Sequence, residues 1–213
     1  LCAGDPVVED NLAVEVSTLA KSKIEFEYVP GVSPITAVPT HAGMSLFTNK
    51  GKEVHILNGS EPIDWSLHLD PTIPIVVINA ADKAPAIASA LIARGRDAAT
   101  PISITRDGST TDQRTIVSTL ENIPVVAKAA RQSGQGVIVI GDLVNNRDKY
   151  QWFENKSLFG WKVLVPRTKE DAEDFQKLLA VYGAVSVEVP TISVEPPRTP
   201  QQMERAVHGL VSG

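Results

Sequence analysis

Three short polar segments stand where the sequence predicts strand ends or a helix start, positions that suit ligand binding. Residues 4–6 (GDP) follow an apolar strand end and can place backbone amides and the Asp5 carboxylate around a ligand. Ser33 and Pro34 predict a helix start, whose free amides attract carboxylates and other polar groups. Residues 107–109 (DGS) predict a turn in which Gly108 lets the backbone approach an adenine or a ribose closely. For each segment alone, an ordinary turn or a capped helix is the favoured interpretation.

The spacing of the reactive residues supports no other kind of site. The sequence contains no GxGxxG, GxxxxGK[ST] or GxSxG motif, which argues against dinucleotide, phosphate-loop and serine-hydrolase sites. The histidines are His41, His55, His68 and His208. They do not stand at metal-ligand spacing from one another or from Cys2, so we expect no metal site. Cys2 lies among apolar residues, which favours a buried structural thiol over a nucleophile. Basic residues stand near the predicted strand ends, and we expect them to lie on a solvated face rather than to contact an acidic substrate. They are Arg106, Arg114, Arg147 and Lys149.

Length, charge and cysteine content narrow the class of protein. The 213 residues suffice for one large domain, or for one domain and part of another. A net charge of -5 disfavours binding to nucleic acid or to an anionic membrane. No apolar run approaches the roughly 20 residues of a membrane helix. The single cysteine excludes an intrachain disulfide and fits a reducing compartment, so we expect a cytoplasmic protein.

Hydrophobic periodicity predicts alternating helices and strands, and therefore an α/β fold with a largely parallel sheet. The predicted helices cover residues 8–21, 33–42, 82–94, 124–132 and 168–182, with a last helix after residue 199. The predicted strands cover residues 24–29, 54–57, 73–78, 102–105, 114–120, 137–140, 163–165 and 185–189. The strand at 114–120 follows the turn at 107–109 so closely that we expect it to be antiparallel to its neighbour.

The order and spacing of several short segments resemble the tetrapyrrole methylase family, and most of all the uroporphyrinogen III C-methyltransferases. The segments are residues 3–6, 29–33, 42–46, 87–95, 100–102, 107–114, 141–144 and 147–153. The TDQR run at 111–114 and the RDK run at 147–149 are the most specific of them. Residues 158–168 and 187–197 resemble the start of uroporphyrinogen III synthase, as in actinobacterial methyltransferase–synthase fusions.

The resemblance implies a two-lobed methylase fold, present here mainly as its second lobe, with the cofactor between the lobes. It implies S-adenosylmethionine as the cofactor, S-adenosylhomocysteine as its product, a tetrapyrrole substrate and a homodimer. Carried over position by position, the cofactor-binding residues are Ala3, Gly4, Asp5, Val8, Ser33, Pro34, Asn79 and Gly108. The acid–base candidates of the family would precede Leu1, because the chain is expected to begin within a fold, so no catalytic residue is named.

The resemblance also implies a division of the chain into four parts. Residues 1–46 would end the N-terminal lobe of the methylase and residues 47–153 would form its C-terminal lobe. Residues 154–160 would be a linker, and residues 161–213 the first, incomplete βαβ segment of the synthase domain. The implied function is S-adenosylmethionine-dependent C-methylation of uroporphyrinogen III, in the siroheme and cobalamin branch, within a bifunctional protein of porphyrin biosynthesis.

Three departures from the family pattern keep a second function open. Ser33 and Pro34 stand where the family usually has a threonine and a small residue, and residues 78–80 (INA) where it often has Tyr-Met-Gly. Residues 47–49 (FTN) stand near the usual Thr-His-Arg. The alternative is a decayed methylase lobe that serves the synthase as a scaffold or dimerisation platform. A more remote alternative is an unrelated α/β protein that binds a small ligand.

Overall fold

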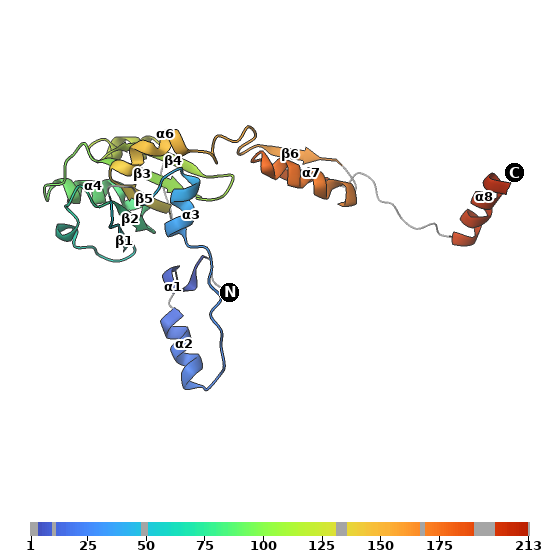
Figure 1. Ribbon diagram of the computed structural model, residues 1–213, viewed down its shortest axis with the longest axis horizontal. Coiled ribbons are helices and arrows are strands. Elements are labelled where there is room, and N and C mark those ends of the chain that lie inside the picture. Colours follow the sequence, from blue (N-terminus) through green and yellow to red (C-terminus); the bar gives the residue numbers. More distant parts are fainter. Residues whose placement is uncertain are drawn as a thin grey trace. The chain divides into compact units, whose positions relative to one another are not determined.

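In the computed structural model the chain forms two compact units, residues Leu1–Phe159 and Gly160–Gly213 (Figure 1). The structure describes residues 4–9, 12–47, 51–130, 136–166, 169–189 and 199–212. Ala3, one of the expected cofactor-binding residues, and Cys2 lie outside the described residues.

The first unit is built on a five-stranded mixed sheet in the order β1-β2-β5-β3-β4. Its strands are β1 (His55–Asn58), β2 (Ile75–Ile78), β3 (Pro101–Arg106), β4 (Arg114–Thr119) and β5 (Gly136–Ile140). β1 and β2 are parallel, whereas the β2–β5, β3–β5 and β3–β4 pairs are antiparallel. The prediction of a largely parallel sheet is therefore wrong, because β5 inserts between β2 and β3 and runs against both. The antiparallel orientation expected for the strand at 114–120 is confirmed, since the connection from β3 is too short for a crossover.

Helices cover both faces of this sheet (Figure 1). On one face, α4 (Ala84–Ile92) and α5 (Ile123–Ala129) join a buried cluster with Ile75 and Val77 of β2. On the other face, α3 (Pro34–His41) packs in a second cluster with Val76 and Ile78. The uninterrupted apolar run of β2 follows from this double burial. Shorter elements of the unit are η1 (Trp65–Leu67), η2 (Ala81–Lys83), η3 (Asp142–Asn146) and α6 (Arg147–Tyr150).

The helix predicted over residues 8–21 is present as α1 (Pro6–Glu9) and α2 (Leu12–Lys21), with residues 10 and 11 outside the described residues. The strand predicted over residues 24–29 is wrong, since these residues form no strand. Ile24, Phe26 and Tyr28 alternate as predicted but are 54%, 43% and 50% exposed. Alternation specifies one face of an extended segment, whereas a strand also needs a hydrogen-bonded neighbour, and no described segment pairs with this one.

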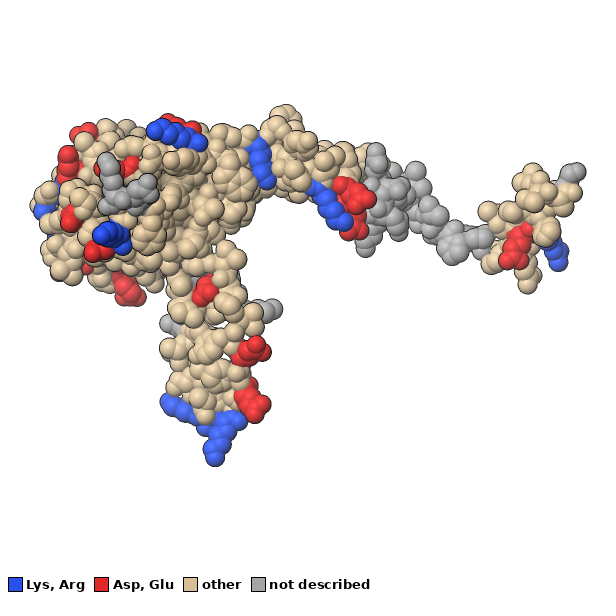
Figure 2. Space-filling view, in the orientation of Figure 1, with Lys and Arg blue, Asp and Glu red and all other residues tan. Residues whose placement is uncertain are grey.

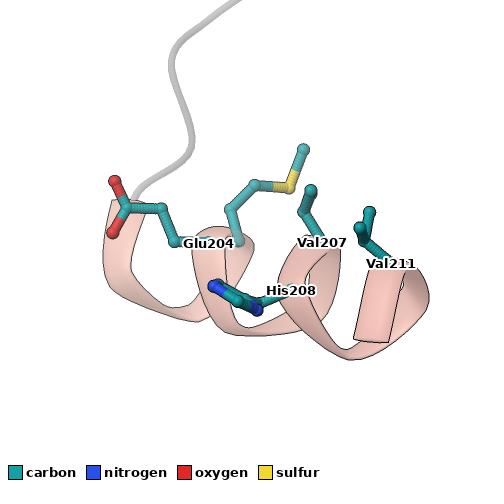
Figure 3. Close-up of a pocket in the computed structure, with 5 residues that line it drawn as sticks. Glu204, Val207, His208 and Val211 are labelled. Atoms are coloured by element: carbon teal, nitrogen blue, oxygen red, sulfur yellow. The ribbon is translucent and has the colours of Figure 1, made fainter. Parts of the chain in front are cut away.

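The second unit contains a βαβ motif, as the sequence predicts. β6 (Lys162–Val165) and β7 (Val185–Glu188) are parallel, and α7 (Lys169–Val181) lies between them in the chain. The last helix, α8 (Pro200–Ser212), has no buried residue, and Val207 and Val211 line a shallow depression along its apolar side (Figure 3). Among the described helices of both units, none combines the length and the apolar character needed to cross a bilayer.

His68, beside the first sheet, should make the stability depend on pH. Its Nδ1 atom lies 2.7 Å from Nδ1 of His55, so one of the two rings donates a hydrogen bond to the other. Burial, and next the charge of His55, hold the pKa of His68 below its ordinary value of 6.5, while Asp64 opposes and Arg96 adds to the shift. The unfolded chain therefore binds more protons than the folded one as pH falls through 6.5.

We accordingly expect the free energy of unfolding to decrease as pH is lowered through the ordinary histidine pKa of 6.5. His68→Gln removes the titrating group and should flatten this dependence between about pH 7 and about pH 5. Thermal unfolding of both proteins across that range measures the effect. An equal pH slope in the two proteins would show that His68 carries no proton linkage.

Candidate functional site

Asp5 connects two of the segments that the sequence singled out. Its Oδ1 accepts a hydrogen bond from the backbone N–H of Val7 at 2.9 Å, at the start of α1. Its Oδ2 accepts from the backbone N–H of Gly31 at 3.1 Å, across 26 residues of chain. A Cβ on Gly31 would lie only 2.0 Å from the carbonyl oxygen of Gly4, so a side chain does not fit there. The backbones of residues 4–5 and 31 thus meet directly.

Ser33 and Pro34 begin α3 as the sequence predicts. Ser33 is the N-cap in an extended conformation, and its hydroxyl oxygen accepts from the backbone N–H of Ile35 at 3.2 Å. Pro34 occupies the first helical position, where its missing N–H costs no helical hydrogen bond. Val8 of α1 packs against the buried cluster to which Ile35 belongs. Val8 therefore contacts the same cluster that buries the inner side of α3.

Capping by Ser33 can be tested separately from any ligand. Ser33→Ala removes the acceptor for the Ile35 amide and should lower the free energy of unfolding by about 1 kcal/mol. Ser33→Asn keeps a side-chain oxygen at the cap and should cost only a few tenths of that amount, on the order of 0.3 kcal/mol. Urea denaturation of the two variants measures the difference. Equal losses for alanine and asparagine would contradict the capping role.

Gly108 lies against the middle of α3. A Cβ on Gly108 would come within 2.4 Å of the Cγ2 atom of Val38, a buried residue of that helix. Its neighbours Asp107 and Ser109 both have left-handed backbones, with φ of 48° and 65°. Such conformations are unfavourable for most residues other than glycine, and hydrogen bonds from the Thr110 N–H and hydroxyl to the carbonyl oxygen of Asp107 stabilise the turn locally.

Asn79 stands apart from this group in its contacts. It follows β2 with a left-handed φ of 56°, and its Nδ2 donates to Oδ1 of Asn58, which ends β1, at 3.4 Å. β1, β2 and β3 all run in one direction, so their C-terminal ends, and with them Asn79 and the turn at 107–109, share one edge of the sheet. The structure thus brings Gly4, Asp5, Val8, Ser33, Pro34 and Gly108 to α3 and its approach, and places Asn79 at the sheet edge.

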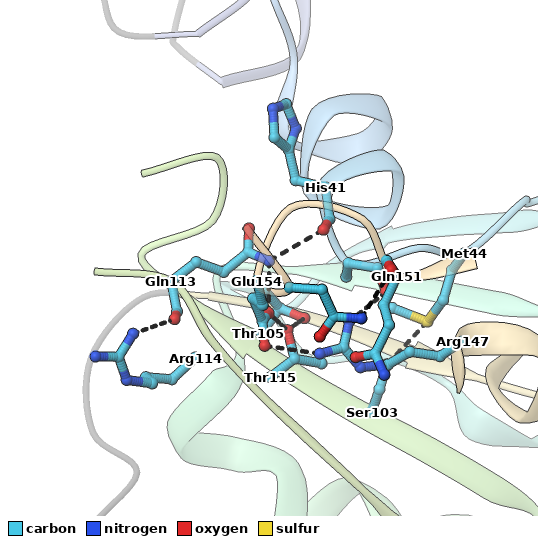
Figure 4. Close-up of polar contacts among 12 residues, drawn as sticks. His41, Met44, Ser103, Thr105, Gln113, Arg114, Thr115, Arg147, Gln151 and Glu154 are labelled. Carbon is cyan, nitrogen blue, oxygen red and sulfur yellow. Dashed lines mark hydrogen bonds and ion pairs between the residues drawn. The ribbon is translucent and has the colours of Figure 1, made fainter. Parts of the chain in front are cut away.

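A buried polar network fixes the C-terminal end of α3 (Figure 4). Gln113 is fully buried, and its Nε2 donates to the carbonyl oxygen of His41 at 3.3 Å and to Oε1 of Glu154 at 2.6 Å. Thr115 of β4 donates to the same Oε1 at 2.6 Å. Arg147 forms an ion pair with Oε2 of Glu154 at 2.7 Å and donates to the carbonyl oxygen of Ala42. The network therefore links α3, β4 and α6.

The expectation of a solvated Arg147 is wrong, because its side chain is only 7% exposed. The resemblance marked the TDQR and RDK runs as specific, but local spacing did not predict that Gln113 and Arg147 meet. Glu154 was not singled out at all. A signal existed in the aromatic pair at 152–153, since Phe153 is buried and places the following carboxylate against the sheet.

One depression lies between residues 59–63 and α4, where Nζ of Lys83 donates to the carbonyl oxygen of Gly59 at 2.5 Å, and no expected cofactor residue lines it. No group of three or more His, Cys, Asp or Glu side chains within the described ranges could hold a metal ion. Acidic and basic side chains are interspersed on the face shown in Figure 2.

Comparison with known proteins identifies the fold around these residues. Residues 1–124 match the family model of tetrapyrrole (corrin/porphyrin) methylases. A siroheme synthase of Azotobacter vinelandii is 32% identical over 162 residues, which are 73% of this chain and 35% of that protein. A siroheme synthase of Klebsiella pneumoniae is 31% identical over 74% of this chain and 34% of its own length. The chain thus spans about a third of the length of the curated relatives it matches.

Two solved structures share the fold. A cobalt precorrin-4 methyltransferase superposes with a TM-score of 0.60 at 17% identity, covering 66% of this chain and 62% of that one. The uroporphyrin-III C-methyltransferase of Thermus thermophilus, solved in complex with S-adenosyl homocysteine, gives a TM-score of 0.55 at 23% identity, covering 67% and 64%. At these identities the likeness establishes the mixed α/β fold alone.

Proposed function

The chain belongs to the tetrapyrrole methylase family, and we propose that its protein transfers a methyl group from S-adenosylmethionine to a carbon atom of uroporphyrinogen III. The observations that carry the proposal are the contact of residues 4–5 with Gly31 just before α3 and the contact of Gly108 with Val38 of the same helix. These segments lie far apart in the chain, and each brings backbone or a polar side chain to α3 or to its approach. A small polar ligand can be held by such a set.

The polar groups at this place suit the nucleoside part of the cofactor. Each carboxylate oxygen of Asp5 accepts one backbone N–H and retains a lone pair for a ribose hydroxyl or an amino group. The Ser33 hydroxyl accepts from Ile35 and keeps its own proton to donate. Gly31 and Gly108 allow close approach of the backbone. When bound, the cofactor supplies a sulfonium methyl group, and the chain's contribution is to position it against the nucleophilic carbon.

We extend the proposal to the rest of the chain. Residues 1–46 and 47–153 would belong to the two methylase lobes, residues 154–160 to a linker, and residues 161–213 to the first segment of a uroporphyrinogen III synthase. The linker would begin within the first unit, because Glu154 belongs to its buried network. Support comes from the separate second unit after Phe159 and from its parallel βαβ motif. The protein would then be a bifunctional enzyme of the siroheme and cobalamin branch. A homodimer and a cytoplasmic location are proposed from the family resemblance and the single cysteine.

A non-catalytic scaffold is the second candidate function. The observation that favours it is Pro34, which leaves the N-terminus of α3 one N–H short at a place where polar ligands bind. In that case the methylase lobe would serve the synthase segment as a packing or dimerisation platform.

Methyl transfer by the full-length protein separates the two functions. The protein is incubated with S-adenosylmethionine and uroporphyrinogen III, and mass spectrometry follows singly and doubly methylated tetrapyrrole together with S-adenosylhomocysteine. We expect methylated tetrapyrrole to form, with one S-adenosylhomocysteine released for each methyl group transferred. Tetrapyrrole that stays unmethylated, while the protein remains folded, would support the scaffold.

A further inference from the structure

The side-chain amide of Gln113 forms hydrogen bonds with three separate parts of the first unit. Its Oε1 accepts from the backbone N–H of Ser109 at 2.8 Å, and its Nε2 donates to His41 and Glu154. The side chain is fully buried, so water does not compete for these bonds. One residue therefore connects the turn at 107–109 to the C-terminal end of α3 and to the buried carboxylate.

The turn depends on such a connection. Asp107 and Ser109 hold left-handed φ angles, which are unfavourable for residues other than glycine and persist only where the surroundings enforce them. Within the turn, the backbone N–H of Thr110 bonds to the carbonyl of Asp107. The acceptor of the Ser109 N–H, Oε1 of Gln113, lies outside these residues, and the adjacent Gly108 lies against Val38 of α3.

We propose that Gln113 is a positioning residue for the cofactor, acting through the turn at 107–109. This inference rests on the proposed function, since it assumes that Gly108 contacts the nucleoside. By holding the turn against α3 before the ligand arrives, Gln113 removes the cost of ordering it during binding. It also ties the position of Gly108 to the helix that Ser33 begins, so that two parts of the site are kept in register.

A pair of variants separates positioning from simple support of the fold. Gln113→Met keeps the length of the side chain but removes the bonds to Ser109, His41 and Glu154. Thr115→Val is the matched control, because it removes a hydrogen bond of equal length, 2.6 Å, to the same Glu154 oxygen without touching the turn. Calorimetric titration of S-adenosylhomocysteine into each full-length protein gives the affinity, and thermal unfolding gives the stability.

We expect Gln113→Met to raise the Kd about tenfold, and Thr115→Val to leave it within about twofold, although both lower the thermal midpoint. Wild-type affinity in Gln113→Met would overturn the inference and leave the proposed function standing. A wild-type protein that does not bind S-adenosylhomocysteine would overturn both.

Gln113→Glu keeps the test decisive if the methionine variant does not fold. Its carboxylate can still accept from Ser109, but it faces Glu154, with Arg147 beyond, and comes closest to the original bonding when it is protonated and donates its single O–H to Glu154. We expect the ratio of the variant's Kd to the wild-type Kd at the same pH to fall toward 1 between about pH 8 and about pH 5. A ratio near 1 at every pH would contradict the part of the positioning role that runs through the bonds to His41 and Glu154.

Discussion

Replacing Glu154 by alanine is expected to lower the free energy of unfolding by about 3–5 kcal/mol. The side chains of Arg147 and Glu154 are 7% and 17% exposed, so the substitution leaves a buried guanidinium with a single carbonyl partner, Ala42. It also removes the acceptor of Gln113 and Thr115. Buried donors without acceptors add to the loss of the ion pair. Urea denaturation followed by circular dichroism measures the change.

Two further variants show whether the loss of stability comes from the buried network or from the removal of a charge. Glu154→Gln keeps an acceptor oxygen but not the charge, and should cost an intermediate amount of about 1–3 kcal/mol. Asp148→Ala removes an equal charge from an exposed position in α6, and should stay within about 0.5 kcal/mol of wild type. If Glu154→Ala and Asp148→Ala destabilise equally, the buried network does not hold the end of α3.

Gly31→Ala is expected to reduce the rate of methyl transfer by about a hundredfold. Its Cβ would lie 2.0 Å from the Gly4 carbonyl oxygen and 3.3 Å from the Cα of Asp5, so the two backbones must separate. Separation breaks the hydrogen bond from Gly31 to Asp5 and moves both away from Ser33. The rate of S-adenosylhomocysteine formation with saturating uroporphyrinogen III is the measured quantity.

Gly95→Ala is the matched control for this variant. Gly95 follows α4 with a φ of 101°, so alanine strains the backbone there, but nothing lies within 4 Å of the added Cβ. It should therefore destabilise the fold and leave the methylation rate of the folded protein unchanged. Equal rates in Gly31→Ala and wild type would show that the contact between residues 4–5 and 31 plays no part in catalysis.

The fold was predictable where local sequence determines structure. The apolar run at 75–78, the cap at Ser33 and the βαβ motif after residue 161 all depend on neighbouring residues, and the structure contains each of them. The order of the sheet was not predictable in this way. β5 pairs with both β2 and β3, and neither pairing leaves a local signal in a strand that is buried on both faces.

The candidate site shows the same division. Ser33 and Gly108 stand in segments that helix capping and turn chemistry single out, whereas Gly31 stands in a segment that only the family resemblance marked. The partners of Gln113 were not predictable, since His41 and Glu154 lie 72 and 41 residues away. From the sequence alone, the two residues of a buried ion pair such as Arg147–Glu154 cannot be distinguished from two separate surface charges.

Calorimetric titration of S-adenosylhomocysteine into the full-length protein tests most directly whether the segments at 4–5, 31–34 and 108 form a cofactor site. We expect one site per chain with a Kd in roughly the micromolar range, and at least about tenfold weaker binding by Gly31→Ala. A folded wild-type protein that releases no binding heat at roughly millimolar ligand would contradict the cofactor site and leave the lobe as a scaffold.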